Sequence, residues 1–223
     1  MISAPRAIPF WSPDEIEAAI GGTIAHIHAR GVVGYPTETV YGFGGGVDRE
    51  SVMNLIALKG RPDNKPFLII VASSEMITRL GLQLTSYASQ LAARFWPGPL
   101  TLVLPGGEKR LPEQLRGPEG GIAVRWTPHE GLARLILAYG EPITSTSANR
   151  PRVPPATSAG EILQQWGDEV ARGTLHVLDG GKLSSSSPST VVDCTSRRPR
   201  VIRPGAISAE LLRESVPDVI GDT

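Results

Sequence analysis

The stretch GYPTETVYGFGGG runs from Gly34 to Gly46 and places two threonines and a glutamate between a proline and four glycines. A turn requires only one or two such residues. Glycine lets another group approach the backbone closely, and hydroxyls supply hydrogen bonds. The stretch therefore predicts a loop that holds a ligand rather than one that only reverses the chain.

The segments on both sides of this stretch read as alternating helix and strand. Ser12 to Glu15 has the pattern of a capping box with proline at the first helical position, and Gly31 ends the apolar periodicity that follows. The segment GVVGYP at 31–36 reads as a strand. Apolar spacing between Asp48 and Gly60 predicts a second helix.

The same alternation continues to the end of the chain. Further strands are predicted at FLIIVA, LTLVLP, GIAVRW, PITST, LHVLD, STVVD and RVIRP. Further helices are predicted at SYASQLAARFW, HEGLARLILAY, AGEILQQW and SAELLRES. Because several strand connections are too short for a crossover helix, we predict an α/β fold with a mixed parallel and antiparallel sheet.

Charge and hydropathy argue against several classes of protein, namely nucleic-acid coats, membrane proteins and secreted proteins. The 223 residues contain 22 basic and 22 acidic side chains, so the formal net charge is zero. This balance argues against a general nucleic-acid coat or membrane binding. No apolar run reaches the ~18 residues of a membrane span, and the N-terminus lacks a secretory pattern, so we expect a cytoplasmic protein. The single cysteine, Cys194, lies in an apolar run and is interpreted as a buried strand residue.

Lys59 and Arg61 flank Gly60 at the end of a predicted helix. Two residues apart, they cannot share one helical face, but a turn at Gly60 lets both side chains converge on one anion. The alternative is that the two cations only complement the helix dipole.

The segment PITSTSANRP at 142–151 carries hydroxyls on both faces of a predicted buried strand. A core strand cannot leave so many polar groups unsatisfied. We interpret the segment as a hydrogen-bonding wall for a polar ligand at the carboxyl end of a strand, with a cap-and-turn network as the alternative.

Arg125 and Arg203 each lie at or near the end of a predicted strand. The guanidinium fork suits carboxylates and phosphates, although either arginine could instead form a surface ion pair. Two common nucleotide-binding motifs, the Walker-type loop and the Rossmann fingerprint, are missing, and the four scattered histidines indicate neither a zinc cluster nor a hydrolase triad.

Eight segments of the chain, in order and approximate spacing, resemble motifs of the YrdC-like family, whose members include threonylcarbamoyl-AMP synthases. The resemblance covers about Ile16 to Ile207 and rests on PTETVYGFG, KGRPDNKPF, FWPGPLTLVLP, AVRWTP, STSANRP, LDGG, STVVD and RVIRPGAI. It implies a twisted mixed sheet around a deep electropositive cavity. It also implies a single YrdC-like domain over residues 1–223, with a short C-terminal tail.

The resemblance implies an ATP-dependent enzyme that joins L-threonine and bicarbonate or CO2 to AMP and releases pyrophosphate. The neutral threonine amine would take up CO2, and the carbamate oxygen would then attack the α-phosphorus. The product would serve threonylcarbamoyladenosine formation in tRNA through downstream transfer proteins. Mg²⁺ is expected to arrive with the nucleotide, with no metal ligands assigned.

The family's motifs also imply the site residues. Lys59 and Arg61 are the expected catalytic residues. The residues expected to face ATP are Lys59, Arg61, Lys65, Ser147, Asn149 and Arg203. The residues expected to hold threonine are Thr37, Arg125, Ser145 and Ser189, with the carboxylate on Arg125. This chain departs from many relatives at Ile70, where they carry histidine, and at Gly121, where they carry threonine.

Two alternatives stay open. A YrdC-like module can carry out carbamoyl-adenylate chemistry on another acceptor, and a module of this fold can bind RNA weakly without catalysis. Zero net charge and few aromatic residues argue against the RNA-binding function.

Overall fold

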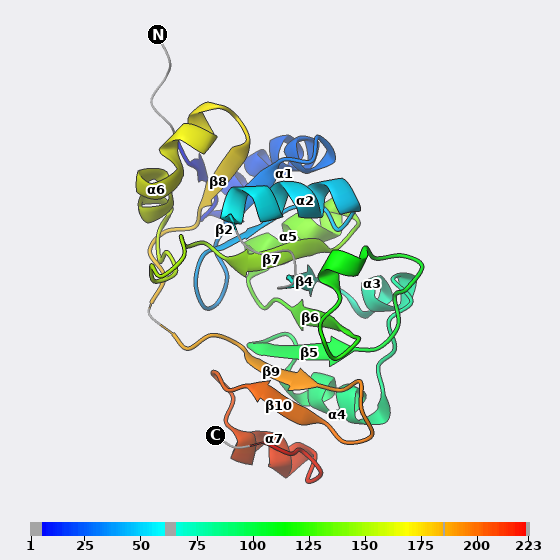
Figure 1. The fold of residues 1–223 in the computed structure, drawn as a ribbon. Helices are drawn as coiled ribbons and strands as arrows, with labels where there is room; N and C mark the ends of the chain where they lie inside the picture. The colour runs from blue at the N-terminus through cyan, green and yellow to red at the C-terminus, as the bar shows by residue number, and fades with distance from the viewer. Residues whose placement is uncertain (1–5, 61–65, 185, 222–223) are drawn as a thin grey trace.

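A computed structural model describes residues 6–60, 66–184 and 186–221 (Figure 1). Within these residues the strands are β1 Ile8–Pro9, β2 Val32–Tyr35, β3 Gly42–Gly44, β4 Leu68–Val71, β5 Leu100–Leu104, β6 Ile122–Trp126, β7 Ile143–Ser147, β8 Leu175–Asp179, β9 Thr190–Asp193 and β10 Arg200–Arg203. The helices are α1 Pro13–His28, α2 Arg49–Lys59, α3 Ser74–Arg79, α4 Ser86–Phe95, the 3-10 helix η1 Glu113–Leu115, α5 Glu130–Tyr139, α6 Ala159–Ala171 and α7 Ala209–Ser215.

The strands form one mixed sheet in the order β1-β8-β2-β3-β7-β4-β6-β5-β9-β10. The pairs β1–β8, β2–β8, β4–β6 and β5–β9 are parallel, and the other neighbours are antiparallel. The predicted α/β class with a mixed sheet is therefore confirmed. Residues 36–41, within the stretch quoted first, join the antiparallel strands β2 and β3 and are too few for a crossover helix.

Most predicted helix ends match the structure because their signals are local. Ser12 caps α1 with a full capping box, in which its Oγ accepts from the Glu15 N–H at 3.3 Å and its own N–H donates to Glu15 Oε2 at 2.9 Å. Asp48 caps α2, and Gly60 ends that helix in the left-handed region at φ 55°. Two predicted helix ends differ from the structure. α1 ends at His28, three residues before Gly31, and α6 continues past the predicted end at Trp166 to Ala171, with a non-helical residue at Trp166. All eight predicted strands are present. β1 and α3, only two and six residues long, were not predicted because so few residues give no readable periodicity.

β3 was also missed, because it consists of part of the glycine run. A Cβ atom on Gly44 would lie 1.7 Å from the carbonyl oxygen of Thr144 in β7. The Gly45 N–H donates to Thr144 Oγ1 at 2.9 Å. We expected Gly42 to Gly46 to let backbone amides approach a ligand; at Gly44 the missing side chain instead lets β3 approach β7.

The register of the central strands gathers polar side chains on one face of the sheet. Thr101 of β5 lies opposite Arg125 of β6, and Leu68 of β4 lies opposite Ser145 of β7. All four line the same cavity, as expected for residues that share a face. The hydroxyls of 142–151 do not all belong there, since Thr144 points to the other face and bonds to Gly45.

Candidate functional site

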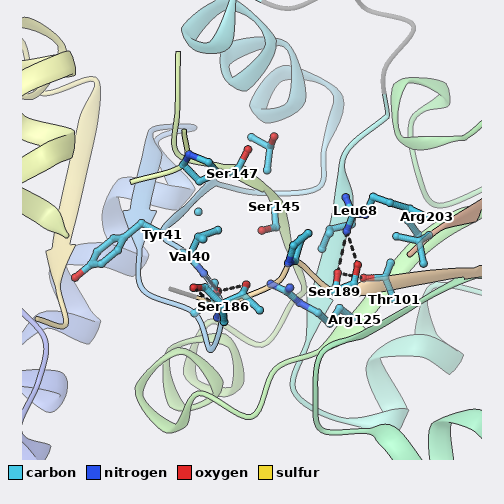
Figure 2. A pocket seen from close by; sticks show the side chains of 18 of the residues that line it. Val40, Tyr41, Leu68, Thr101, Arg125, Ser145, Ser147, Ser186, Ser189 and Arg203 are labelled. Atoms are coloured by element: carbon cyan, nitrogen blue, oxygen red, sulfur yellow. Dashed lines mark hydrogen bonds between the residues drawn. The ribbon is translucent and has the colours of Figure 1, made fainter. Parts of the chain in front are cut away.

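A cavity of about 740 Å³ lies against this face of the sheet (Figure 2). Such a volume falls in the range typical of small-molecule sites. We expected a site at the carboxyl end of a strand, but the wall extends across β3, β7, β4, β6, β5, β9 and β10. It is lined by Thr37, Thr39, Val40, Tyr41, Gly42, Pro66, Leu68, Thr101, Ala123, Arg125, Ser145, Thr146, Ser147, Pro154, Pro155, Thr157, Ser186, Pro188, Ser189, Val191 and Arg203.

Arg125 is the most buried charged residue of this wall, with 5% of its surface exposed. Its Nη1 forms an ion pair with Glu38 Oε1 at 3.3 Å, while its Nε is buried without a hydrogen-bond partner in the described part of the chain. Glu38 comes from the stretch quoted first and was not predicted as a site residue. A buried guanidinium with unused donors is suited to receive an anionic ligand.

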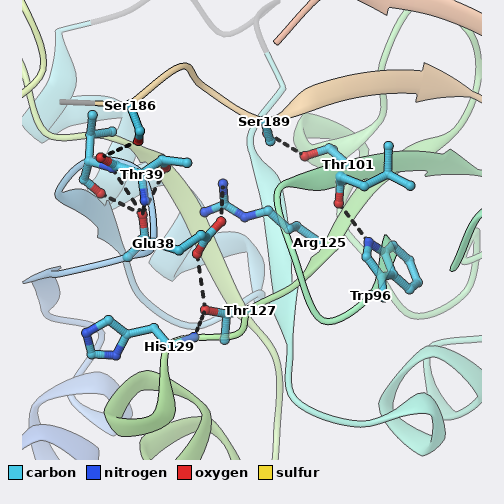
Figure 3. A network of polar contacts seen from close by, with 12 residues as sticks. Glu38, Thr39, Trp96, Thr101, Arg125, Thr127, His129, Ser186 and Ser189 are labelled. Atoms are coloured by element: carbon cyan, nitrogen blue, oxygen red, sulfur yellow. Dashed lines mark hydrogen bonds and ion pairs between the residues drawn. The ribbon is translucent and has the colours of Figure 1, made fainter. Parts of the chain in front are cut away.

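Glu38 is supported from behind by the segment that leads into α5 (Figure 3). Thr127 Oγ1 lies 3.5 Å from Glu38 Oε2, and Thr127 Oγ1 accepts from the His129 N–H at 3.1 Å. His129 caps α5, because its Nδ1 accepts from the Leu132 N–H at 3.2 Å. Burial lowers the pKa of His129, which favours the neutral ring that this cap requires.

The loop from Thr37 to Tyr41 is ordered by its own hydroxyls. Thr37 Oγ1 donates to the Val40 carbonyl at 2.7 Å and accepts from the Thr39 N–H at 3.1 Å. Ser186 Oγ donates to the Thr39 carbonyl at 3.1 Å, which joins the loop to the segment before β9. The two threonines therefore build the loop in addition to lining the cavity.

A second group lies around Arg203 on the other side of the wall. Arg203 Nη2 donates to the Ser189 carbonyl at 2.7 Å and to Ser189 Oγ at 3.1 Å. Ser189 Oγ also lies 2.8 Å from Thr101 Oγ1. Burial, and then the positive charge of Arg125, lower the pKa of Arg203. Because both arginines line the cavity and their positive charges repel each other, an anion bound between or beside them would be stabilised.

Lys59 and Asn149 lie next to the cavity but not on its wall. The Lys59 ammonium donates to the Ser147 carbonyl at 2.8 Å, to Asn149 Oδ1 at 3.1 Å and to the Asn149 carbonyl. Ser147 Oγ, which does line the cavity, donates to Asn149 Oδ1 at 2.6 Å. The lysine of the KGRPDNKPF segment therefore holds the turn of the STSANRP segment.

The structure thus brings together most of the residues implied by the resemblance. Six lie on the wall: Thr37, Arg125, Ser145, Ser147, Ser189 and Arg203. Arg61 and Lys65 lie outside the described residues. Sequence reasoning missed Thr101 and Glu38. Glu38 lies between Thr37 and Thr39 in the ligand-holding loop that the sequence predicted, but no feature of the sequence indicates that it forms an ion pair with Arg125.

The two departures from the family lie off the wall. Ile70 is fully buried beside Arg125 in the β4–β6 register. A Cβ on Gly121 would lie 2.5 Å from Thr195 Cγ2 and 2.7 Å from Val103 Cγ1, so this chain has no room for a threonine there. Neither residue lines the cavity.

Other chemistries receive no support from the described residues. Cys194 is buried as predicted, and burial raises the pKa of its thiol to about 12, which disfavours a nucleophilic thiolate. In these parts of the chain, no group of three or more histidines, cysteines, aspartates or glutamates could hold a metal ion. Across the same residues, every helix is too short or too polar to cross a membrane.

Comparisons with known proteins agree with this arrangement. A family model, Sua5_yciO_yrdC, described as "Telomere recombination", matches residues 25–205. A protein of Pyrococcus abyssi named threonylcarbamoyl-AMP synthase is 36% identical over 84% of this chain, which spans about half (54%) of that relative's length. A Klebsiella pneumoniae protein of the same name is 36% identical, over 78% of this chain and 90% of the relative.

Solved structures show the same fold. The crystal structure of P. abyssi Sua5 complexed with L-threonine matches with a TM-score of 0.85 and 32% identity, over 96% of this chain and 62% of that one. Escherichia coli YciO matches with a TM-score of 0.74 and 25% identity, over 89% of this chain and 94% of that one.

Proposed function

The chain belongs to the Sua5/YciO/YrdC family, and on this premise we propose that it is an L-threonylcarbamoyladenylate synthase. It would use L-threonine, bicarbonate or CO2, and ATP to form threonylcarbamoyl-AMP and pyrophosphate. The observation that carries the proposal is the buried, incompletely paired Arg125 on the wall of a cavity that also presents hydroxyls, a second arginine and apolar side chains. The names of the relatives and the threonine bound to P. abyssi Sua5 support it.

The amino acid would lie at the Arg125 end of the cavity. Arg125 would pair with the carboxylate of the amino acid. Glu38 engages only Nη1 of the guanidinium, and Nε has no hydrogen-bond partner among the described residues. Hydroxyls of Thr37, Ser145 and Ser189 line the same space and would meet its polar groups. A charge-assisted pair at a site this buried is stronger than a neutral hydrogen bond.

ATP would occupy the part of the cavity toward Ser147 and Arg203. Lys59 would support the nucleotide through the turn that it holds, because its ammonium already donates to Ser147 and Asn149. Arg61 and Lys65, outside the described residues, stay predicted nucleotide contacts, and the catalytic assignment of Lys59 and Arg61 likewise stays a prediction.

The reaction needs positioning and charge neutralisation rather than a covalent enzyme intermediate. The threonine amine adds to CO2 and loses a proton to form a carbamate. A carbamate oxygen then bonds to the α-phosphorus, and the bond from that phosphorus to the bridging oxygen breaks to release pyrophosphate. Arg203 would neutralise phosphate charge, and oriented reactants can contribute about 7–11 kcal/mol of rate acceleration.

Mg²⁺ would accompany the nucleotide phosphates. The described residues offer it no cluster of carboxylates or histidines, so no protein ligand is assigned and no step depends on one. The product would pass to proteins that transfer the threonylcarbamoyl group to tRNA.

The proposal is tested by incubating the purified protein with ATP, Mg²⁺, bicarbonate and one amino acid at a time. Pyrophosphate release should be fastest with L-threonine and should require bicarbonate. Equal release with all amino acids, or none with threonine, would contradict the proposal. A salt titration of RNA binding in parallel separates catalysis from the RNA-binding alternative, whose affinity would fall steeply with salt.

A further inference from the structure

Glu38 is an acidic residue placed directly behind the arginine that would receive the substrate. Its Oε1 is buried and lies 3.3 Å from Arg125 Nη1, while its Oε2 faces Thr127 at 3.5 Å. Its side chain is only 16% exposed, and Glu38 does not line the cavity. An effect of this carboxylate on a bound ligand would therefore pass through Arg125 and through its charge, rather than through direct contact.

The ion pair sets both the orientation and the charge of this end of the cavity. Glu38 engages Nη1 and leaves Nε of Arg125 without a partner in the described part of the chain. The guanidinium is thereby fixed from one side while donors remain for a ligand. Because the pair is shielded from water, its negative charge is screened less than a surface carboxylate would be.

We propose that Glu38 is a specificity-determining residue that makes this end of the cavity selective for zwitterionic amino acids over other carboxylates. The inference rests on the proposed function, in which Arg125 pairs with the substrate carboxylate. In an α-amino acid the ammonium is separated from the carboxylate by a single carbon, so it enters the field of Glu38 together with the carboxylate. Attraction between Glu38 and the ammonium offsets the repulsion between Glu38 and the carboxylate. A carboxylate without an amine is repelled by Glu38 and has no ammonium group to offset that repulsion.

Glu38→Gln removes the charge while keeping the length of the side chain. The test measures dissociation constants by calorimetry for L-threonine and for 3-hydroxybutyrate, which is threonine without its amine. The preference for threonine over 3-hydroxybutyrate should fall at least about tenfold in Glu38→Gln. The control is Glu17→Gln, since Glu17 is 71% exposed in a surface ion pair with Arg134, and it should leave the preference unchanged.

A preference within about twofold of wild type in folded Glu38→Gln would overturn the proposal. If Glu38→Gln does not fold, Glu38→Asp carries the test, because the shorter carboxylate retreats from Arg125 and the preference should fall at least about threefold. An unchanged preference in Glu38→Asp would then overturn it. Wild-type protein that binds no threonine would overturn the proposed function as well, whereas threonine binding with an unaltered preference overturns only this inference.

Discussion

The cavity is bordered by two buried cations that differ in how well they are paired. Lys59 is 9% exposed and Arg125 is 5% exposed, so burial does not separate them. The Lys59 ammonium has acceptors on Ser147 and Asn149 for all three of its protons, whereas Arg125 has a buried Nε without a hydrogen-bond partner among the described residues. The sequence predicts that each binds an anionic group, with Lys59 facing ATP and Arg125 holding the threonine carboxylate. From this difference we propose that Lys59 holds the wall and that Arg125 receives the ligand.

The largest expected effect comes from Lys59→Met. Removing the ammonium takes a donor away from the carbonyls of Ser147 and Asn149 and from Asn149 Oδ1, although the Asn149 N–H still donates to the Ser147 carbonyl at 3.1 Å. The expected cost is on the order of 2–4 kcal/mol in the free energy of unfolding. Denaturant titration measures the change. Lys182→Met, at an exposed position, should shift it by less than about 0.5 kcal/mol. A stable Lys59→Met protein with impaired nucleotide use would reverse the roles assigned above.

Arg125→Lys should act on substrate use more than on stability. The ammonium keeps the charge but loses the fork that serves Glu38 and a carboxylate together. The threonine KM in pyrophosphate release should rise about 10- to 100-fold, which corresponds to about 1.5–3 kcal/mol, with little change in the ATP KM. A change below about 1 kcal/mol would be typical of a loose surface ion pair and would count against the assignment.

Ser147→Ala removes a hydroxyl that lines the cavity and donates to Asn149 Oδ1 at 2.6 Å. We expect a loss of about 1 kcal/mol in ATP affinity, or roughly fivefold, and no change in threonine affinity. Equilibrium binding of a non-hydrolysable ATP analogue to wild type and Ser147→Ala measures the loss of nucleotide affinity. An equal loss for both ligands would show that the two ends of the cavity are not separate.

The smallest effect concerns pH at the Arg125 end. Because burial lowers the pKa of His129, the folded protein binds fewer protons there than the unfolded chain once the pH falls below about 6.5. This contribution to stability is present above that pH and is lost as the pH falls toward the folded-state pKa. The slope of the free energy of unfolding should stay below the single-proton limit of about 1.4 kcal/mol per pH unit. His129→Asn keeps a capping side chain and should flatten this part of the profile in denaturant titrations from pH 7.5 to pH 5; an unaltered profile would show that His129 does not titrate with folding.

Local signals explain what the sequence could predict. The capping box at Ser12 and the glycine stops at Gly60 and Gly140 depend on neighbours within a few residues, and those helix ends are as predicted. β3 could not be predicted, because Gly44 is required by the close approach of Thr144, which lies far away in the sequence. That the chain forms a single domain stays a prediction.

In the candidate site, too, local features of the sequence could be predicted and long-range contacts could not. Arg125 and Ser145 could be identified because a polar residue in a buried apolar strand requires a hydrogen-bond partner, which a ligand can supply. That Glu38 pairs with Arg125, and that Lys59 is saturated by the Ser147–Asn149 turn, depends on tertiary contacts that no single sequence contains. The sequence indicated several polar residues of the site but neither Glu38 nor Thr101, and it could not show which of them already have hydrogen-bond partners.

Calorimetric titration of L-threonine and of ATP, each alone, into wild type and Arg125→Lys tests the division of the cavity most directly. We predict that threonine affinity falls about 10- to 100-fold in Arg125→Lys while ATP affinity stays within about twofold. Weakened ATP binding with unchanged threonine binding would contradict the account, because Arg125 would then belong to the nucleotide end.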